Sequence, residues 1–470
     1  MTVQAHANDP PWDLIVIGGG VAGLTAANRA AERGRRVLLL EKGESAKYLC
    51  NTRFSGGAFH IGMRDVHSDP RGLYAAVMES TDGFADPDLL ATLVERAPPT
   101  LKWMRAQGVR FGRVPAINQQ NVLLPLRPNR PGIRWQGRGG DVLVRDFGAR
   151  FLARGGTLRR AAKAEHLLVD SGCVRGVRLA GANGLEEELL AHCVLLADGG
   201  YQANPELLAQ HITSRPEQLM QRNAGTGCGD GLRMAVAVGA ALRGMDSGFY
   251  GHLLSREALV KNTLWPFPIL DFLASAGIVI DAQGRRFCDE TEGGVFTANA
   301  LSRLPDPAGA YVVFDESMWQ SAGAHRAIPP NPHLVLAGGV VQSASTLENL
   351  ARQIGIPPEP LMTTVSSYHS ALAKGTLAQL QPPRRQGLAT ARPLQHPPFH
   401  AIAAVSGITY TMGGISTDHR ARVLRPDGTW IPGLYAAGAT TGGLEGGPRS
   451  GYVGGLMKSA VFGWLAGDAA

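Results

Sequence analysis

Residues 13–23 read DLIVIGGGVAG, and this stretch decides the fold. Its first five residues form a short apolar run of the kind that becomes a buried parallel strand. Three glycines follow at the spacing G-x-G-x-x-G, as Gly18, Gly20 and Gly23, and the alanine-rich segment 24–33 predicts a helix. Such glycines allow a tight turn, close approach of the backbone to a pyrophosphate, and close packing of helix on strand. The stretch therefore predicts a Rossmann-like dinucleotide site.

The chain directly after this helix completes a β-α-β unit. Gly34 ends the predicted helix, and the apolar run 37–40 predicts a second parallel strand. Glu41 and Lys42 follow that strand. A carboxylate at this place can accept hydrogen bonds from ribose hydroxyls and would repel a 2′-phosphate. We therefore place Glu41 and Lys42 in the dinucleotide site, together with Ala22 in the glycine-rich turn.

The middle of the chain differs in character from its two ends. From about residue 244 to residue 393 the pattern loosens into short mixed elements rich in proline and aromatic residues. A chain of 470 residues also exceeds what one hydrophobic core usually supports. We therefore predict an α/β fold in which a Rossmann-like nucleotide-binding domain, residues 1–245 and 395–470, is split around an inserted α+β cap domain, residues 246–394.

Composition excludes several other classes of protein. The formal charge of +7 is spread along the chain rather than gathered in a basic stripe, so we expect no nucleic acid partner, and the positive field suits small anionic substrates. No stretch approaches the roughly 20 apolar residues of a membrane span. The five cysteines lack C-x-x-C spacing and support neither a disulfide framework nor a zinc site. We expect a cytoplasmic protein with reduced thiols and no metal.

Three further segments point to a family. They read ADGG at 197–200, TMGGI at 411–415 and IPGLYAAG at 431–438. Together with the N-terminal motif they closely resemble the flavoprotein family of fumarate reductases and succinate dehydrogenases, over most of the nucleotide domain. The resemblance implies that FAD extends across this domain and that the substrate is held against the flavin under the cap. The residues it adds to the FAD site here and in the last helix are Ala197, Gly199, Gly438 and Leu456.

A loop after the second strand resembles the segment that runs beside the flavin ring in this family. It adds five residues to the expected FAD site: Asn51, Thr52, Ser55, Gly56 and Gly57. The succinate dehydrogenase branch carries a histidine there that is linked covalently to FAD, and no histidine aligns within 51–57. The resemblance therefore implies noncovalently bound FAD.

The substrate residues of the family carry over unevenly. Arg449 matches the arginine that clamps a substrate carboxylate, a task that suits a guanidinium fork. His252 resembles the histidine that bonds a carboxylate or carbonyl from the cap side. Tyr410, however, stands where fumarate reductases have a histidine, and Gly294 stands where they carry the proton-donating arginine. The segment around Gly294 instead resembles the tricarballylate dehydrogenase branch, which oxidises carboxylates, while a tyrosine-bearing site resembles that of 3-ketosteroid dehydrogenases.

We therefore expect an FAD-dependent oxidoreductase that dehydrogenates a carbon–carbon bond next to a carboxylate or carbonyl of a small organic substrate. A hydride would pass to flavin N5 while a base removes a proton from the neighbouring carbon. Arg449 would bind the electron-withdrawing group, and Tyr410 and then His252 are the candidates for the proton-transfer group. The alternatives are a fumarate-reductase-like reductase, a 3-ketosteroid-type dehydrogenase, and a flavin-binding subunit that only passes electrons to a partner. The sequence does not identify the electron acceptor.

Overall fold

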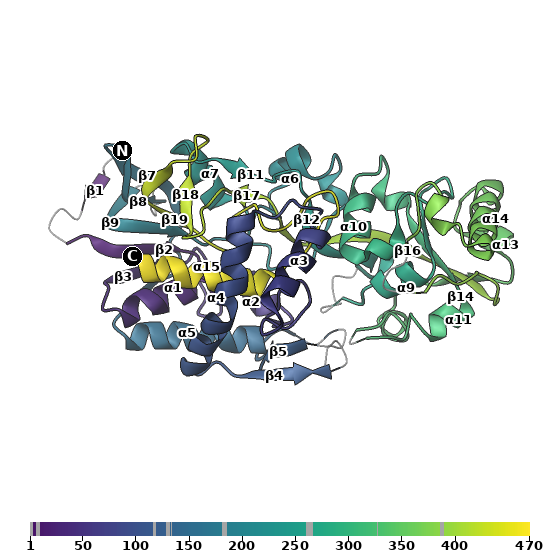
Figure 1. Cartoon of the computed structure of the whole chain (residues 1–470), viewed down its shortest axis with the longest axis horizontal. Helices are drawn as coiled ribbons and strands as arrows, with labels where there is room; N and C mark the ends of the chain where they lie inside the picture. Colours follow the sequence, from purple (N-terminus) through teal and green to yellow (C-terminus); the bar gives the residue numbers. More distant parts are fainter. Residues whose placement is uncertain are drawn as a thin grey trace.

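The computed structural model describes residues 3–5, 10–115, 119–127, 132, 134–180, 186–259, 267–326, 328–385 and 390–470. The molecule is elongated and contains two large β-sheets (Figure 1). Elements from both ends of the sequence gather around the first sheet, and elements from the middle of the sequence gather around the second. The chain thus builds the first sheet, passes into the second, and returns.

The first sheet has the strand order β18-β19-β9-β2-β3-β6. β2 lies at its middle and pairs in parallel with β3 on one side and β9 on the other. β19 comes from the C-terminal part and also pairs in parallel with β9, so the predicted return of the chain to this sheet is confirmed. The strand bounds are β2 (Trp12–Ile17), β3 (Val37–Leu40), β6 (Thr157–Arg159), β9 (Glu186–Leu196), β18 (Arg422–Leu424) and β19 (Trp430–Ala436).

An antiparallel extension is attached to β9. β7 (Ala164–Asp170) and β8 (Cys173–Leu179) form a hairpin, and β8 pairs with the first half of β9. This half of β9 begins with Glu186, Glu187 and Glu188. A run of charged residues is not the apolar pattern from which a buried strand is predicted, so the sequence does not indicate this part of β9. β1 (Val3–Ala5) pairs in parallel with the same half.

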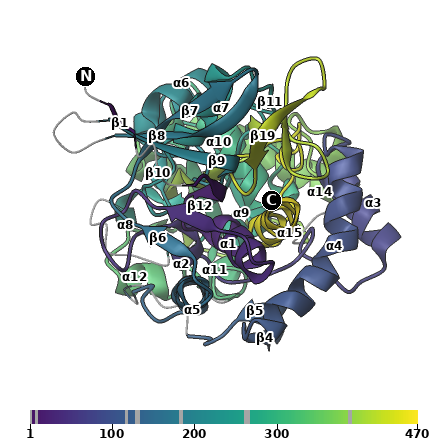
Figure 2. The ribbon, with the colours of Figure 1, turned by 90° about the vertical axis from the view of Figure 1, so that its left-hand side faces the viewer.

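Two helices lie side by side at the centre of this half of the molecule (Figure 2). They are α1 (Val21–Glu32) and α15 (Gly455–Ala469). A Cβ atom on Gly463 would lie 2.3 Å from the carbonyl oxygen of Ala22, so only glycine permits this approach. Gly467 meets the carbonyl oxygen of Ala26 at the same distance. The last helix is therefore fixed directly against the start of α1, beside the glycine-rich turn.

The second sheet is organised around one long strand, β16 (Phe399–Thr411), which is almost entirely buried. β12 (Phe249–Ser255), β14 (Tyr311–Asp315) and β15 (Gln342–Ala344) pair with it antiparallel, and β13 (Ile278–Ile280) pairs with β14. The short strand β10 (Met220–Gln221) pairs with β16 in parallel. A separate hydrophobic cluster fills this half of the molecule.

Two strands of the second sheet come from outside the residues predicted for the cap. β10 precedes residue 246 and β16 follows residue 394. Amino-acid composition does not indicate which strands pair with each other. The glycine-rich segments that follow β16 in the chain favour the nucleotide domain in a prediction from sequence, whereas the strand itself belongs to the second sheet. The division at residues 245 and 395 stays a prediction.

Among the described residues, no helix combines the length and the apolar character that a bilayer span requires.

The other helices and strands surround these two sheets. Their bounds are α2 (Asn51–Phe54), α3 (Pro70–Ser80), α4 (Pro87–Ala106), β4 (Phe111–Val114), β5 (Gln119–Leu123), α5 (Gly139–Ala153), α6 (Pro205–His211), α7 (Asp230–Ala237), β11 (Leu242–Arg243), α8 (Arg256–Leu259), α9 (Asp271–Ala276), α10 (Gly294–Ser302), α11 (Glu316–Gln320), α12 (His333–Leu336), α13 (Leu347–Gln353), α14 (Pro358–Lys374) and β17 (Gly414–Ile415).

Candidate functional site

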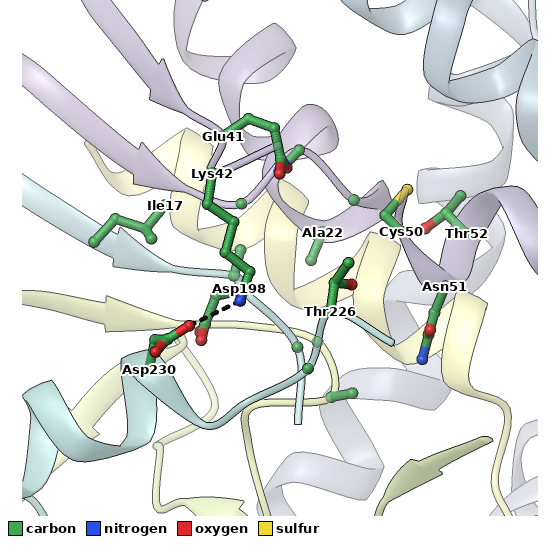
Figure 3. A pocket seen from close by; sticks show the side chains of 18 of the residues that line it. Ile17, Ala22, Glu41, Lys42, Cys50, Asn51, Thr52, Asp198, Thr226 and Asp230 are labelled. Atoms are coloured by element: carbon green, nitrogen blue, oxygen red, sulfur yellow. Dashed lines mark hydrogen bonds and ion pairs between the residues drawn. The ribbon is translucent and has the colours of Figure 1, made fainter. Parts of the chain in front are cut away.

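A cavity of about 840 Å³ opens at the carboxyl ends of the parallel strands β2, β3 and β9. The start of α1 forms one wall, and the strand end at Gly438 contributes to another. Figure 3 shows Lys42 and Asp230 at one end of this pocket and Asn51 and Thr52 at the other. Open α/β sheets bind nucleotides at this edge, so we name it the nucleotide cavity.

The three motif glycines have different reasons to be glycine. A Cβ on Gly23 would lie 2.0 Å from the carbonyl oxygen of Gly18, and a Cβ on Gly18 would lie 2.5 Å from that of Ala197. The protein's own packing therefore requires both. A Cβ on Gly20 would meet only the Thr52 hydroxyl, at 3.6 Å, and would fill space at the cavity wall. A phosphate that approaches the start of α1 needs this space, so the turn fits a dinucleotide pyrophosphate.

Acidic side chains line the end of the nucleotide cavity away from Asn51. Glu41 accepts hydrogen bonds from the amides of Gly19 (2.9 Å) and Gly43 (2.8 Å), and burial raises the pKa of its carboxyl above the usual range despite these bonds. Burial raises the pKa of Asp198 to about 6, and one of its carboxylate oxygens is buried with no hydrogen-bond partner among the described residues. Lys42 pairs with Asp230 at 2.8 Å. Glu41 and Asp198 can therefore accept further hydrogen bonds from a ligand's hydroxyl or amino groups.

A second cavity, of about 1,320 Å³, continues from the first. Five residues line both: Val21, Asn51, Thr52, Ala439 and Ser459. The second cavity lies where the loop after α2, the end of β16 and the start of α15 meet. We name it the catalytic cavity. The continuous walls give room for one extended molecule with its two ends in different surroundings.

The charges on the catalytic cavity have one sign. Arg138, Arg222 and Lys458 line it, and no aspartate or glutamate is among its described lining residues. Lys458 is buried and is neutralised from behind by Glu445, at 2.6 Å. The two arginines therefore set the charge, and the cavity suits an anion.

Arg222 is held in place from one side. It follows β10, and its Nη1 donates to the hydroxyl of Thr409, at 3.0 Å, on the neighbouring strand β16. Its Nε is buried and has no hydrogen-bond partner among the described residues. A buried donor of this kind is costly unless a ligand or water satisfies it. Arg222 lines the catalytic cavity, so other atoms of its guanidinium can donate to an oxygen of a bound ligand.

Three tyrosines also line the catalytic cavity: Tyr250, Tyr410 and Tyr452. The rings of Tyr250 and Tyr452 stack with centroids 3.9 Å apart, and Tyr410 lies 5.4 Å from Tyr250. Burial raises the pKa of all three phenols, and the charge of Glu445 adds to the rise at Tyr410. All three therefore stay protonated at neutral pH.

His60 lines the same cavity and has no counterpart in the sequence-based predictions. It lies just beyond the loop assigned to 51–57, is only 4% exposed, and accepts a hydrogen bond from the amide of Met63. Burial lowers its pKa to about 4. The ring is therefore neutral near pH 7. The only sequence feature that could have indicated His60 is its position three residues after Gly57. Nothing in the sequence shows that its side chain is buried.

The three predicted catalytic residues lie in different places. Tyr410 lines the catalytic cavity and donates to Glu445 at 2.9 Å. His252 does not line it, but contacts Tyr250, which does. Arg449 lines neither cavity: its side chain is 38% exposed and is paired with Glu292, with 2.7 Å between its Nε and the carboxylate.

The structure brings most of the predicted FAD residues together along the two cavities. Those on the nucleotide cavity are Gly18, Gly20, Ala22, Glu41, Lys42, Asn51, Thr52, Ala197, Gly199 and Gly438. Those on the catalytic cavity are Asn51, Thr52, Ser55, Gly56, Gly57 and Leu456. Gly23 lines neither and supports the turn from behind.

Comparisons with known proteins agree with this geometry. A family model described as "FAD binding domain" matches residues 13–452. The chain is 28% identical to NADH:fumarate oxidoreductase of Klebsiella pneumoniae, over 98% of this chain and 47% of that protein. It is 26% identical to 3-oxosteroid 1-dehydrogenase of Mycobacterium tuberculosis, over 99% of this chain and 98% of that protein. Thus the chain spans about half the length of the fumarate relative and nearly all of the steroid relative.

The fold is also that of a solved structure. The 3-ketosteroid-Δ4-(5α)-dehydrogenase of Rhodococcus jostii RHA1 superposes with a TM-score of 0.76, at 21% identity, over 100% of this chain and 99% of that one. At this identity the likeness concerns the fold alone.

The motif glycines generate a first prediction. Gly20→Val should abolish FAD binding, because the side chain fills the space that the pyrophosphate needs, while the apoprotein keeps its melting temperature. Gly23→Val should lower both the FAD content and the melting temperature of the apoprotein, because the valine side chain would collide with the backbone of Gly18. FAD released on denaturation and the melting temperature of the apoprotein are measured. Gly148→Ala, at another open glycine, is the control, and full FAD content in Gly20→Val would contradict the assignment.

His60 generates a second prediction, about pH. Because burial lowers its pKa to about 4, the unfolded chain takes up a proton near pH 6.5 and the folded chain does not. Stability should therefore fall between pH 6.5 and 4, by about 2 kcal/mol at pH 5 from this group alone. Urea unfolding at pH 7 and pH 5 measures the loss, which should be smaller in His60→Asn. The exposed His67 supplies the control His67→Asn, and an equal loss in both variants would refute the role of burial.

Proposed function

This chain belongs to the FAD-binding family whose model matches residues 13–452, and we propose that it is an oxidoreductase acting on a carbon–carbon bond next to a carboxylate. The single observation that carries the proposal is the catalytic cavity. It continues from the nucleotide cavity, carries two arginines, and has no acid among its described lining residues. A carboxylate-bearing substrate would complete this charge pattern.

FAD is the cofactor of this family, and the two cavities fit its two halves. The open space at Gly20 and the start of α1 would take the pyrophosphate, and Glu41 the hydroxyls of the adenosine ribose. Asn51, Thr52 and the glycines at 56 and 57 would lie along the flavin. Bound FAD supplies the acceptor of a hydride at flavin N5. We propose noncovalent attachment, as the lack of a histidine at 51–57 indicates.

Arg222 is the residue that we propose to bind the substrate carboxylate, with Arg138 beside it on the same cavity. A guanidinium presents paired donors that match a carboxylate and stabilises the charge that develops when the neighbouring carbon loses a proton. Arg449 was assigned this task from the sequence. Its pairing with Glu292 and its position outside both linings favour Arg222 instead.

A proton must also leave the substrate. Of the two candidates named from the sequence, Tyr410 lines the cavity directly and His252 reaches it through Tyr250. The neutral His60, whose Nδ1 accepts from the amide of Met63, can donate a hydrogen bond to the substrate from Nε2. We propose dehydrogenation as the direction, because Gly294 stands where the family resemblance places the proton-donating arginine of fumarate reductases. The electron acceptor that reoxidises the flavin is a separate partner of unknown identity.

A second candidate function is dehydrogenation of a cyclic ketone. The stacked tyrosines and the apolar Phe54, Met63 and Ile328 on the catalytic cavity support it. So does the match to a 3-oxosteroid 1-dehydrogenase along nearly its whole length. An uncharged ketone, however, would bring no negative charge to Arg222 on the cavity wall. We therefore rank it second.

We propose the cytoplasm as the location. All five cysteines are free thiols in the structure. Unpaired thiols suit a reducing compartment.

The proposal is tested by mixing the purified protein anaerobically with di- and tricarboxylates and with 3-ketosteroids, and following the loss of flavin absorbance. At least one saturated carboxylate should bleach the flavin, and no steroid should do so at a comparable rate. Bleaching by steroids alone would replace our proposal with the second candidate.

The carboxylate clamp generates a mutational prediction. In Arg222→Lys the charge remains but the fork is lost, so kcat/KM for the active carboxylate should fall by about a hundredfold, roughly 2.7 kcal/mol, with FAD content unchanged. Arg449→Lys is made in parallel. A hundredfold loss in Arg449→Lys and none in Arg222→Lys would restore the assignment made from the sequence.

A further inference from the structure

A connected row of polar side chains leads away from the catalytic cavity into the second sheet. The hydroxyl of Tyr250 lies 3.2 Å from Nε2 of His252, and Nδ1 of His252 lies 2.5 Å from a carboxylate oxygen of Asp271. The other oxygen of Asp271 accepts from the amide of Leu253, at 3.0 Å. Tyr250 alone of the three lines the cavity. The row therefore has one end at the substrate and the other end anchored to the backbone.

The order of donors in this row follows from chemistry. An ionised carboxylate only accepts hydrogen bonds, so Nδ1 of His252 must donate to Asp271. In a neutral imidazole, Nε2 is then left without a proton and must accept from the phenol of Tyr250. Asp271 thus selects the tautomer in which His252 can take a proton from Tyr250.

The pairing of β12 with β16 and the start of α9 bring Tyr250, His252 and Asp271 together. Tyr250 and His252 are two residues apart on β12, so both side chains project to the same face. β12 pairs with β16, and a register shift after Tyr250 puts this residue opposite Tyr410, at the end of β16 where the cavity lies. Asp271 begins α9 and reaches back to the same strand.

Gly294 explains how Asp271 can occupy its position. A Cβ atom on Gly294 would lie 1.8 Å from the carboxyl carbon of Asp271, so any side chain at 294 would displace this carboxylate. Position 294 is one of the two at which the sequence departs from fumarate reductases, here by lacking their arginine. The space next to it is filled by the acid that pairs with His252. The start of α10, at Gly294, also favours a negative charge there.

The second tyrosine of the cavity has a less suitable partner. Tyr410 donates to Glu445, which also accepts from Lys458 and from the amides of Val453 and Gly454. Although burial acts in the opposite direction, Lys458 and these hydrogen bonds hold the pKa of Glu445 below its usual range. Such a carboxylate is a poor acceptor for a proton from Tyr410. Nε2 of His252, by contrast, has a lone pair that can take a proton in the tautomer that Asp271 selects.

We propose that Tyr250 is the catalytic proton-transfer residue and that His252 and Asp271 act behind it as a relay, which we name the Tyr250 relay. The inference rests on the proposed dehydrogenation. The C–H bond next to the substrate carboxylate breaks, its proton bonds to the oxygen of Tyr250, and the phenol's own proton passes to Nε2 of His252. The hydride of the neighbouring carbon is taken up by FAD, so one carbon–carbon double bond forms. Asp271 stabilises the resulting imidazolium.

Asp271 is a positioning residue in this relay, because it acts through His252. The tautomer of His252 tests this role without any measurement of turnover. Nitrogen-15 spectra of the FAD-loaded protein, with His252 assigned from its absence in His252→Gln, should show Nδ1 protonated and Nε2 unprotonated. Asp271→Asn should lose this single tautomer. A wild-type His252 that is protonated on Nε2 alone would overturn the relay.

A kinetic comparison tests Tyr250 itself. With a carboxylate that reduces the flavin, Tyr250→Phe should slow reduction at least about a hundredfold and Asp271→Asn at least about tenfold, with FAD content and substrate affinity little changed. Tyr311→Phe is the matched control, because Tyr311 lies on β14, donates to the carbonyl of Ile354 and lines neither cavity, and it should keep the wild-type rate. The ionisable groups facing Tyr250 include Arg222, Asp271, Tyr452 and Glu445, so the rates are compared at a fixed pH.

The two kinds of failure are distinguishable. If Tyr250→Phe keeps the wild-type rate while Tyr410→Phe loses it, the relay is refuted and the proposed function stands. If no carboxylate reduces the wild-type flavin, the proposed function fails, and the tautomer of His252 alone then decides whether the relay exists.

Discussion

One steric constraint organises the molecule: at the turn between β2 and α1, backbone segments approach so closely that no side chain fits. Gly23 packs on the carbonyl of Gly18, and Gly18 on that of Ala197 at the end of β9. These contacts aim the start of α1 at the edge of the sheet. Gly463 then lets α15 pack on the same turn. The nucleotide cavity is the space that remains in front of this packing.

The catalytic cavity depends on the same packing. The start of α15, which the turn holds, supplies Leu456 and Lys458, and the end of β16 supplies Tyr410 from the second sheet. Glu445 joins these parts, because its carboxylate accepts from Tyr410 and from Lys458. The catalytic cavity thus lies where the two sheets meet, with Lys458 on its wall and Glu445 behind that wall.

The motif residues of the nucleotide cavity were the easier part to predict, because they lie close together in the chain. Gly18, Gly20 and Glu41 belong to one strand–turn–helix–strand unit, whose conformation follows from composition and spacing. The residues of the catalytic cavity were harder to predict from sequence. Arg222, His60 and Asp271 have meaning only through partners far away in sequence, such as Thr409 and His252. Arg449 fitted a family pattern, but the sequence could not reveal that Glu292, 157 residues away, binds its guanidinium.

We propose that the two cavities form one site for a single extended flavin dinucleotide. Calorimetric titration of the apoprotein with FAD and with FMN tests this, because FMN lacks the adenylate that the nucleotide cavity would hold. We expect one FAD bound per chain and an affinity for FMN at least about a hundredfold weaker, a difference of roughly 2.7 kcal/mol. Equal affinity for the two flavins would contradict it.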